Sequence, residues 1–388
     1  MTNASTTPFL PDYAALAEFF STPFNGSRRP PRVAVVGDYC LDKYLYVYPA
    51  LEEASVETGL PAYQIRGKRL FAGVGGTIAN NLRALGAETF CFGVIGEDGE
   101  GFELLQALRR IGANVEGMVV SPEVLTGTYM KPMFLREAPV VQGRLATPEE
   151  GSWEEGNRLD IRNPQPVAPK LVDELKRRFL AALPSFDAVV VSDQFPAGSE
   201  ALFSTEFRQF VSETAAATPN VFFLCDSRFF IDDYRGALVK CNADEALDAY
   251  DAANAGGSRR ETTVRQDGDA DENAVLAAGR WLAARNRRPV LITRGSRGSL
   301  LFEAAAPENQ EPVLRIPSVK VEPPIDICGA GDATNAGFAF ARALGLPLAS
   351  AAFIAGVVSS ITIKQIGVTG TASPAEITST LRRLAVNS

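Results

Sequence analysis

The sequence of 388 residues contains no histidine. This absence excludes Ser-His-Asp and Cys-His nucleophilic centres, histidine general bases and histidine metal ligands. A general base in this chain is therefore a carboxylate or, less readily, a lysine, tyrosine or cysteine. A bound metal ion would be a hard, oxygen-ligated one such as Mg²⁺.

Cysteine is also scarce, with five residues that are widely scattered and form no CxxC pair. Neither a disulfide framework nor a zinc site is predicted from such a distribution. The N-terminus has no basic start followed by an apolar run, so we do not expect a signal peptide. These features favour a reduced, cytoplasmic protein. The five are Cys40, Cys91, Cys225, Cys241 and Cys328.

The chain lacks an excess of positive charge, since its 46 acidic residues outnumber its 38 lysines and arginines and its formal net charge is −8. This balance argues against a nucleic-acid or membrane-surface partner and favours a small-molecule ligand held in a local pocket. Residues 343–363 carry no charge, but Gly345, Pro347, Gly356 and several serines interrupt them. We therefore expect a buried pair of helices there and not a transmembrane span.

Buried apolar segments alternate with amphipathic ones along most of the chain. Residues 32–38 form an apolar strand that ends in Asp38, and residues 188–193 and 221–226 repeat the pattern. This rhythm predicts an α/β fold, a doubly wound and mostly parallel sheet flanked by helices. Ligands of such sheets gather at the carboxyl ends of the strands, where Asp38 and Asp42 would hold the hydroxyl groups of a sugar.

Two segments depart from this rhythm. Residues 43–70 and about 124–145 show short aromatic and aliphatic alternations, broken by glycine and proline. They predict short strands that pair with each other as a small β lid. We expect residues 1–29 to form an N-terminal helical extension and residues 30–388 to form one domain carrying this lid. Residues 140–168 allow no functional prediction.

The most informative stretch lies near the C-terminus, where Gly329, Ala330 and Gly331 precede Asp332 at a predicted helix start. Glycines let backbone N–H groups approach a ligand closely, and a helix N-terminus supplies unpaired donors. These amides would form an anion hole, with Asp332 as the base that takes a proton from the attacking group. A tight turn with a capping aspartate is the alternative.

Three further patterns carry possible chemistry. Gly75-Gly76 opens a helix with Asn80 one turn later, which permits close approach of a ligand or merely starts a helix. Asn242 and Glu245 are three apart, as in a helix capping box, and Glu245 would otherwise help to hold Mg²⁺. Residues 238–245 that contain this pair predict an edge strand turning into a helix. Residues 289–302 predict a strand, a glycine turn and a returning strand, and the turn would approach a nucleotide.

Together these patterns resemble, in order, the ribokinase-like (PfkB) carbohydrate kinase family. Gly75-Gly76 with Asn80 resembles its first signature, and residues 326–332 with Asn335 resemble its second. Asn242 with Glu245 resembles its N-x-x-E element. Within the family, residues 37–44, 191–193 and 366–373 are most similar to the heptose phosphate kinases of ADP-heptose synthesis.

The resemblance implies ATP-dependent phosphorylation of a hydroxyl group of a sugar or sugar phosphate, with Mg²⁺ as cofactor. Asp332 would be the base, and the amides of Gly329, Ala330 and Gly331 would hold the transferring phosphate. The implied substrate-binding residues are Asp38, Asp42, Gly75, Gly76, Asn80 and Asp193. The implied residues facing ATP and magnesium are Asn242, Glu245, Thr293, Arg294, Gly295, Gly298 and Asn335.

The sequence also departs from the family pattern. Ile327 and Cys328 stand where the family often has threonine or another small polar residue, which leaves open any monovalent-cation loop. Residues 194–196 replace a segment that is typically glycine-rich and basic in heptose kinases, which leaves the acceptor open. Basic lid residues would either meet a phosphate on the substrate or be plain solvated charge; these are Arg66, Lys68, Arg69, Lys131 and Arg136.

Other functions remain open at this point. A kinase for a nucleoside or another small alcohol has the same fold, and a sensor that binds a sugar or nucleotide without catalysis would keep the pocket. A dinucleotide-dependent oxidoreductase lacks its G-x-G-x-x-G after the first strand, because acids follow Gly37. Exposed lid strands tend to pair, so a homodimer through the lid is a further expectation.

Overall fold

The main sheet of the computed structural model is mostly parallel and has nine strands among the described residues, in the order β1-β20-β19-β18-β17-β16-β15-β2-β7. The structure describes residues 6–22, 29–136, 140–141, 144–145, 147–148, 150–163, 165–195, 202–255, 270–303 and 313–387. Only β19 runs antiparallel to both of its neighbours. The strands are β1 (Thr6–Pro8), β2 (Arg32–Gly37), β7 (Glu88–Phe92), β15 (Ala188–Asp193), β16 (Phe222–Ser227), β17 (Leu238–Asn242), β18 (Val290–Thr293), β19 (Ser299–Phe302) and β20 (Val313–Ile316).

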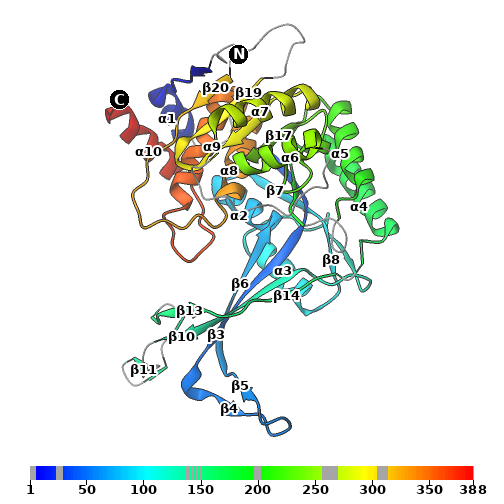
Figure 1. Cartoon of the computed structure of the whole chain (residues 1–388), viewed down its shortest axis with the longest axis vertical. Helices are drawn as coiled ribbons and strands as arrows, with labels where there is room; N and C mark the ends of the chain where they lie inside the picture. Colours follow the sequence, from blue (N-terminus) through cyan, green and yellow to red (C-terminus); the bar gives the residue numbers. More distant parts are fainter. Residues whose placement is uncertain are drawn as a thin grey trace.

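Helices cover both faces of this sheet (Figure 1). Alternate residues of β2 join different cores: Val33 and Val35 pack in one hydrophobic cluster and Ala34 and Val36 in the other. Two buried faces explain why the strand is apolar throughout. One face is covered by α1 (Tyr13–Ser21), α2 (Gly75–Leu85), α8 (Ala330–Ala343), α9 (Leu348–Thr362) and α10 (Pro374–Asn387). The other is covered by α4 (Pro169–Ala182), α5 (Thr205–Ala217), α6 (Ala243–Ala255) and α7 (Glu272–Asn286).

A second sheet extends away from the helix-covered body (Figure 1). Its order is β13-β10-β3-β6, and β14 also pairs with β10. The pairing expected between the two lid segments is found, because β3 and β10 are parallel neighbours. Part of the uninterpreted segment 140–168 extends this sheet. The strands are β3 (Tyr39–Val47), β6 (Ile65–Val74), β10 (Thr128–Leu135), β13 (Trp153–Glu155) and β14 (Leu159–Ile161).

Short elements complete the chain. The hairpin of β4 (Glu53–Ala54) and β5 (Pro61–Ala62) lies at the far end of the second sheet (Figure 1). α3 (Gly99–Arg110) lies against β3 and β6. Two small pairs are β8 (Val94–Gly96) with β9 (Val119–Ser121) and β11 (Val140–Val141) with β12 (Arg144–Leu145).

The N-terminal segment is built into the main body. β1 pairs in parallel with β20, and α1 packs against α10. The described part of the expected helical extension is therefore continuous with the domain that follows. Residues 1–5 and 23–28 of that extension, residues 137–139 and 142–143 of the second lid segment, and Pro196 lie outside the described residues.

Two other expectations have clear outcomes. Residues 238–242, expected as an edge strand, form β17 in the interior of the sheet between β16 and β18, so that prediction was wrong. The strand tolerates two polar residues inside the sheet because Lys240 pairs with Asp226 and Asn242 caps α6. The uncharged stretch near the C-terminus forms α9 and packs on α8, as expected for a buried helix pair. Within the described residues no helix has the length and apolar character needed to span a membrane.

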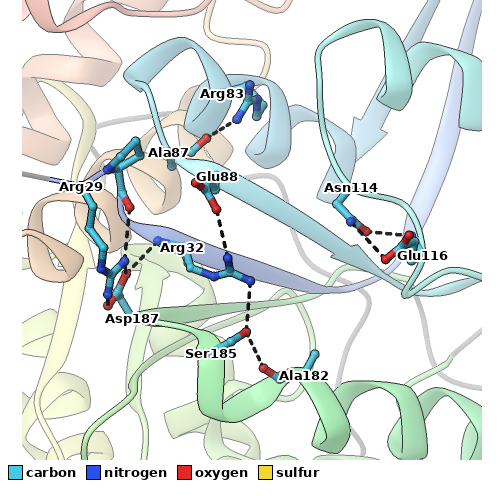
Figure 2. Close-up of polar contacts among 11 residues, drawn as sticks. Arg29, Arg32, Arg83, Ala87, Glu88, Asn114, Glu116, Ala182, Ser185 and Asp187 are labelled. Atoms are coloured by element: carbon cyan, nitrogen blue, oxygen red, sulfur yellow. Dashed lines mark hydrogen bonds and ion pairs between the residues drawn. The ribbon is translucent and has the colours of Figure 1, made fainter. Parts of the chain in front are cut away.

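The amino ends of the strands carry ion pairs that tie neighbouring segments together (Figure 2). Arg29 donates from both terminal nitrogens to Asp187, at 2.6 and 2.8 Å, and Arg32 bonds Glu88 at 3.2 Å. Ser185 accepts a further hydrogen bond from Arg32. These contacts join the start of β2 to the starts of β7 and β15.

Candidate active site

The predicted anion hole, an anion cradle of backbone N–H groups, lies at the N-terminus of α8. Gly329, the N-cap residue, has φ of +75°, which strongly favours glycine, and a Cβ there would lie 2.7 Å from Thr369. The N–H of Ala330 donates to the carbonyl of Ile327 at 3.1 Å. Those of Gly329, Gly331 and Asp332 have no partner within the described part of the chain. The geometry therefore favours these three donors over Ala330, which the sequence had included.

Asp332 lies in the first turn of α8, next to these donors, and its side chain is half-buried. Burial raises the pKa of this carboxyl to about 7, and the charge of Asp226 adds to the rise, whereas Lys240 and Arg228 oppose it. A carboxyl group that titrates near neutral pH is suited to take a proton during a reaction. This is the behaviour required of the predicted base.

A buried network missed by the sequence analysis supports this corner of the site. Asp226, at the carboxyl end of β16, accepts hydrogen bonds from Lys240 Nζ at 2.9 Å and from Asn335 Nδ2 at 2.5 Å. All three residues are at most 5% exposed as a whole. A Cβ on Gly331 would lie 3.4 Å from Lys240 Nζ, so the ammonium group points toward the cradle. Lysine within an otherwise apolar strand was the available signal.

Asn335 was expected to face the nucleotide. Its amide nitrogen is instead committed to Asp226 inside the fold. Its Oδ1 atom is buried and has no hydrogen-bond partner among the described residues. The position supports a role in orienting Asp226 and Lys240, and not the predicted contact with a cofactor.

Asn242 and Glu245 form a reciprocal capping box at the start of α6. The N–H of each residue donates to the side chain of the other, both at 2.8 Å. The capping alternative is therefore present in the structure. Burial raises the pKa of Glu245 to about 7, with Asp226 as the next cause, which places this carboxyl in the same electrostatic neighbourhood as Asp332.

Asp38 lies at the carboxyl end of β2, as expected. Its Oδ2 atom accepts from the N–H groups of Gln194 and Phe195, each at 2.9 Å, and its carbonyl accepts from Gly75 at 3.0 Å. Burial, and secondarily Asp193, raises the pKa of Asp38 to about 8. Asp38 thus holds residues 194–195 and the start of α2 in place. Because its Oδ2 atom is already bonded, any contact with a substrate would be made by its Oδ1 atom.

The two glycines that open α2 are required by close packing. A Cβ on Gly75 would lie 2.9 Å from the ring of Tyr39, and one on Gly76 would lie 2.3 Å from the Cβ of Ala72. They let β6 turn directly into α2 beside β3. Asn80 follows on α2 and is half-buried, with no hydrogen bond in the described structure that would commit its amide.

Asp42 lies on β3, where the second sheet meets the body. Its Oδ1 atom is 3.2 Å from Lys131 Nζ, and this ammonium group also donates to the hydroxyl of Tyr44 at 3.1 Å. Burial acts to lower the pKa of Lys131, but Asp42 and Tyr44 outweigh it and raise the pKa. A hydroxyl group binding at Asp42 would therefore meet a carboxylate that is paired with an ammonium group.

Asp193 does not face the site. Its Oδ2 atom accepts from Arg208 Nε and Ser227 Oγ, both at 2.8 Å, and from the hydroxyl of Tyr234 at 3.1 Å. Its side chain is completely buried, and burial raises its pKa against the opposing effect of Arg208. The predicted contact with substrate is not supported, because the carboxylate is enclosed in a structural ion-pair network.

The glycine turn after β18 has the expected shape. Gly295 and Gly298 both have positive φ, and a Cβ on Gly298 would lie 2.2 Å from the carbonyl oxygen of Ile316. Thr293 donates to the carbonyl of Cys241 at 3.3 Å. Arg294 turns inward to Glu272 at 3.1 Å, so its guanidinium group is already paired. Its backbone N–H donates to the carbonyl of Gly298 at 2.8 Å and holds the turn closed.

The basic side chains of the second sheet are largely paired. Lys68 contacts Glu103, Arg136 contacts Glu154, and Lys131 contacts Asp42. Arg69 lies over the ring of Tyr46, 6.0 Å from its centroid. Arg66 is exposed. Plain surface charge accounts for most of this set.

The residues present fit a Mg²⁺ ion that is held by one or two carboxylates and otherwise by water and phosphate oxygens. Asp226 raises the pKa of both Glu245 and Asp332, so negative charge is concentrated there. Within the described residues, however, no three acidic or sulfur ligands converge as a metal cage. Mg²⁺ usually keeps several waters and binds through one or two carboxylates plus phosphates, which suits this arrangement.

Comparison with known proteins places this geometry in context. The chain is 29% identical over 344 residues to the bifunctional protein HldE of Trichlorobacter lovleyi, and 28% identical over 347 residues to that of Caulobacter vibrioides. The alignments cover 88% and 89% of this chain but 61% and 62% of those relatives. The chain thus spans about three fifths of their length.

Solved structures show the same fold. The phosphofructokinase-2 of Escherichia coli in complex with fructose-6-phosphate matches with a TM-score of 0.61, 15% identity, and coverage of 92% of this chain and 99% of that one. The ribokinase of Arabidopsis thaliana complexed with ribose and ATP matches with a TM-score of 0.59, 16% identity, and coverage of 91% and 99%. The model of the pfkB family carbohydrate kinases matches residues 154–376, and the chain belongs to that family.

Proposed function

We propose that this protein transfers the terminal phosphoryl group of ATP to a hydroxyl group of a sugar or sugar phosphate. The observation that carries the proposal is the position of Asp332. Its carboxyl group has a pKa raised to about 7 and adjoins the unpartnered N–H groups of Gly329 and Gly331. A base and an anion cradle at one helix end are the two parts that phosphoryl transfer to an alcohol requires.

The proposed reaction balances without any further reactant. Asp332 takes the proton of the acceptor hydroxyl, the hydroxyl oxygen forms a bond to the terminal phosphorus, and the bond from that phosphorus to the bridging oxygen of ADP breaks. The amides at the start of α8 and the ammonium group of Lys240 stabilise the negative charge on the transferring group. Asn335 and Asp226 hold Lys240 in place by the contacts described above.

On the acceptor side, we assign the sugar to the region where the second sheet joins the body. Asp42, Asn80 and the free oxygen of Asp38 supply polar groups there, and Gly75 and Gly76 allow close approach. The sequence resembles heptose phosphate kinases, so a heptose phosphate is the first acceptor to test. Ribose, fructose 6-phosphate and nucleosides complete the panel.

On the nucleotide side, we assign the surface of the turn formed by Thr293, Arg294, Gly295 and Gly298 to ATP. Asn242 and Glu245 lie at the carboxyl end of β17, next to that turn. Glu245 would hold Mg²⁺ through water. A bound Mg²⁺ would neutralise charge on the phosphate oxygens.

The decisive experiment measures ADP release from ATP with each acceptor of the panel, and Asp332→Asn serves as the matched blank. Turnover with a sugar or sugar phosphate, lost in the variant, would support the proposal. Turnover only with nucleosides would assign the alternative kinase activity. Ligands that raise the melting temperature without any turnover would instead indicate a sugar or nucleotide sensor.

We also propose that two copies associate through the second sheet. Val56, Leu60 and Tyr63, at and beside the β4–β5 hairpin, are 97%, 65% and 54% exposed. Such apolar exposure marks an interaction surface. Analytical ultracentrifugation of Leu60→Asp should show monomer where the parent chain shows dimer; a monomeric parent would contradict the assignment. For its compartment, the use of ATP and the free state of the five cysteines favour the cytoplasm.

A further inference from the structure

A second concave site lies at the amino ends of the main strands, on the opposite edge of the sheet from the proposed catalytic centre. It is a cavity of about 410 Å³ between β16, β17 and the last turn of α8. Its lining includes the side chains of Arg288, Arg342, Asn220 and Asp187. None of these residues has a part in the proposed phosphoryl transfer.

Arg342, in the last turn of α8, is the central feature of this cavity. Its Nη1 atom donates to the carbonyl of Leu346, and its guanidinium carbon is 5.3 Å from the centroid of the Phe222 ring. Its Nε atom is buried and meets no acceptor in the part of the chain that the structure describes. Within the described residues no carboxylate pairs with it, and burial lowers its pKa. The side chain is therefore held rigidly with its charge uncompensated.

The surroundings add positive charge and remove negative charge. Arg288 is exposed at the same cavity and has no ion pair in the described structure. The one carboxylate of the lining, Asp187, is already bound at both oxygens by Arg29 and also accepts the N–H of Arg32 at 2.8 Å (Figure 2). Within the described part of the chain, two guanidinium groups without a carboxylate partner thus line this cavity, and its one acid is already paired with Arg29.

We propose that this cavity binds a small metabolite through a phosphate group. A guanidinium group presents donors in a planar fork that matches the oxygens of phosphate, and partial desolvation strengthens such a contact. Asn220 adds an amide donor at the rim, and the volume exceeds that of phosphate alone, so room remains for a small organic portion. The site is separate from the catalytic centre, because the 14 residues of α8 span about 20 Å.

The test uses inorganic phosphate as the probe and the full chain. Calorimetric titration is performed with the catalytic site filled by one equivalent of a non-hydrolysable ATP analogue with Mg²⁺ and no sugar phosphate, so that the second cavity stays open to phosphate. Arg288→Glu reverses an exposed charge with little risk to folding. Arg342→Gln removes the partly buried charge, and Arg110→Ala on α3 is the matched control for loss of an exposed arginine.

We expect the dissociation constant for phosphate to rise about tenfold or more in Arg288→Glu and in Arg342→Gln, as for loss of a charge-assisted contact. It should stay unchanged in Arg110→Ala. Malonate in place of phosphate should bind more weakly if the site selects phosphate; equal binding would make it a general oxyanion site and overturn the phosphate assignment. Absence of saturable binding, or equal affinity in all variants, would overturn the proposal altogether.

A structural readout locates the ion independently. A crystal soaked with tungstate should give an anomalous peak between Arg288 and Arg342, and Arg288→Glu should lose that peak while keeping any peak at the start of α8. Peaks confined to the start of α8 in the parent chain would contradict the proposal without bearing on the proposed kinase activity.

Discussion

The amino and carboxyl edges of the main sheet, where its strands begin and end, differ in how far their ion pairs are exposed to water. At the amino edge, Arg32 and Glu88 form an ion pair whose side chains are 36% and 47% exposed. At the carboxyl edge, Asp226 and Lys240 pair with side chains that are both 6% exposed, and two further carboxyls lie near enough to feel the same charge. Water screens the first pair, whereas the second acts on its neighbours.

This difference in exposure explains why the shifted carboxyl pKa values lie at the carboxyl edge. The carboxyls of Asp332 and Glu245 both have pKa values raised to about 7, with burial as the first cause and Asp226 as the second. Groups with such displaced pKa values gather at functional sites because catalysis needs them. On the proposed function, the carboxyl edge is the one that carries the catalytic groups.

The largest effect should come from the base itself. Asp332→Asn keeps the shape of the side chain but cannot accept the acceptor's proton, so kcat should fall by on the order of 10² to 10⁴. Affinity for ATP should remain nearly unchanged. Steady-state ADP release and nucleotide titration measure the two quantities, and a fully active variant would rule out Asp332 as the base.

Lys240→Met should have the next largest effect, on stability. It leaves Asp226 buried without its cation, which should cost about 3–5 kcal/mol in the free energy of unfolding. The matched double variant Asp226→Leu with Lys240→Met removes both charges and should recover most of that loss. Urea denaturation compares the three proteins; equal loss in single and double variants would mean that packing, and not charge, dominates here.

Much of the fold followed from patterns that depend on local sequence. Apolar strands buried on both faces and glycine-opened helices specify a doubly wound sheet almost independently of their partners. Strand order and edge position do not, because they depend on contacts between distant segments. That is why residues 238–242 were placed at an edge, whereas β17 lies inside the sheet.

The site was predictable by position but not by side-chain direction. Asp193 and Asp226 both end buried strands, yet only Asp226 faces the cradle, whereas Asp193 pairs with Arg208. Alternate residues of a strand point to opposite faces, so a shift of one residue decides which acid reaches a site. Lys240 was missed because its role depends on the neighbouring strand that carries Asp226.

The pH dependence of activity offers a finer comparison. The base must be ionised to act, and the pKa of Asp332 is raised to about 7. Thus kcat/KM should rise with pH through a midpoint near 7. Asp226→Asn removes a negative charge that raises this pKa and frees Lys240 to stabilise the ionised base, so the midpoint should move to lower pH by about one unit.

The matched control for that shift is Glu245→Gln, which changes a nearby carboxyl that also belongs to a capping box. A midpoint that stays near 7 in Asp226→Asn would mean that burial alone sets the pKa. A shift to higher pH would contradict the electrostatic account.

The smallest effect should appear at the amino edge. Glu88→Gln breaks the exposed pair with Arg32, while Arg32 keeps its hydrogen bond to Ser185 and its position over the ring of Phe90 at 4.6 Å. The free energy of unfolding should therefore fall by less than about 1 kcal/mol, and added salt should erase most of that difference. Urea denaturation at low and high salt measures both. A decrease in the free energy of unfolding as large as that of Lys240→Met, and insensitive to salt, would show that the ion pairs at the two edges contribute equally to stability.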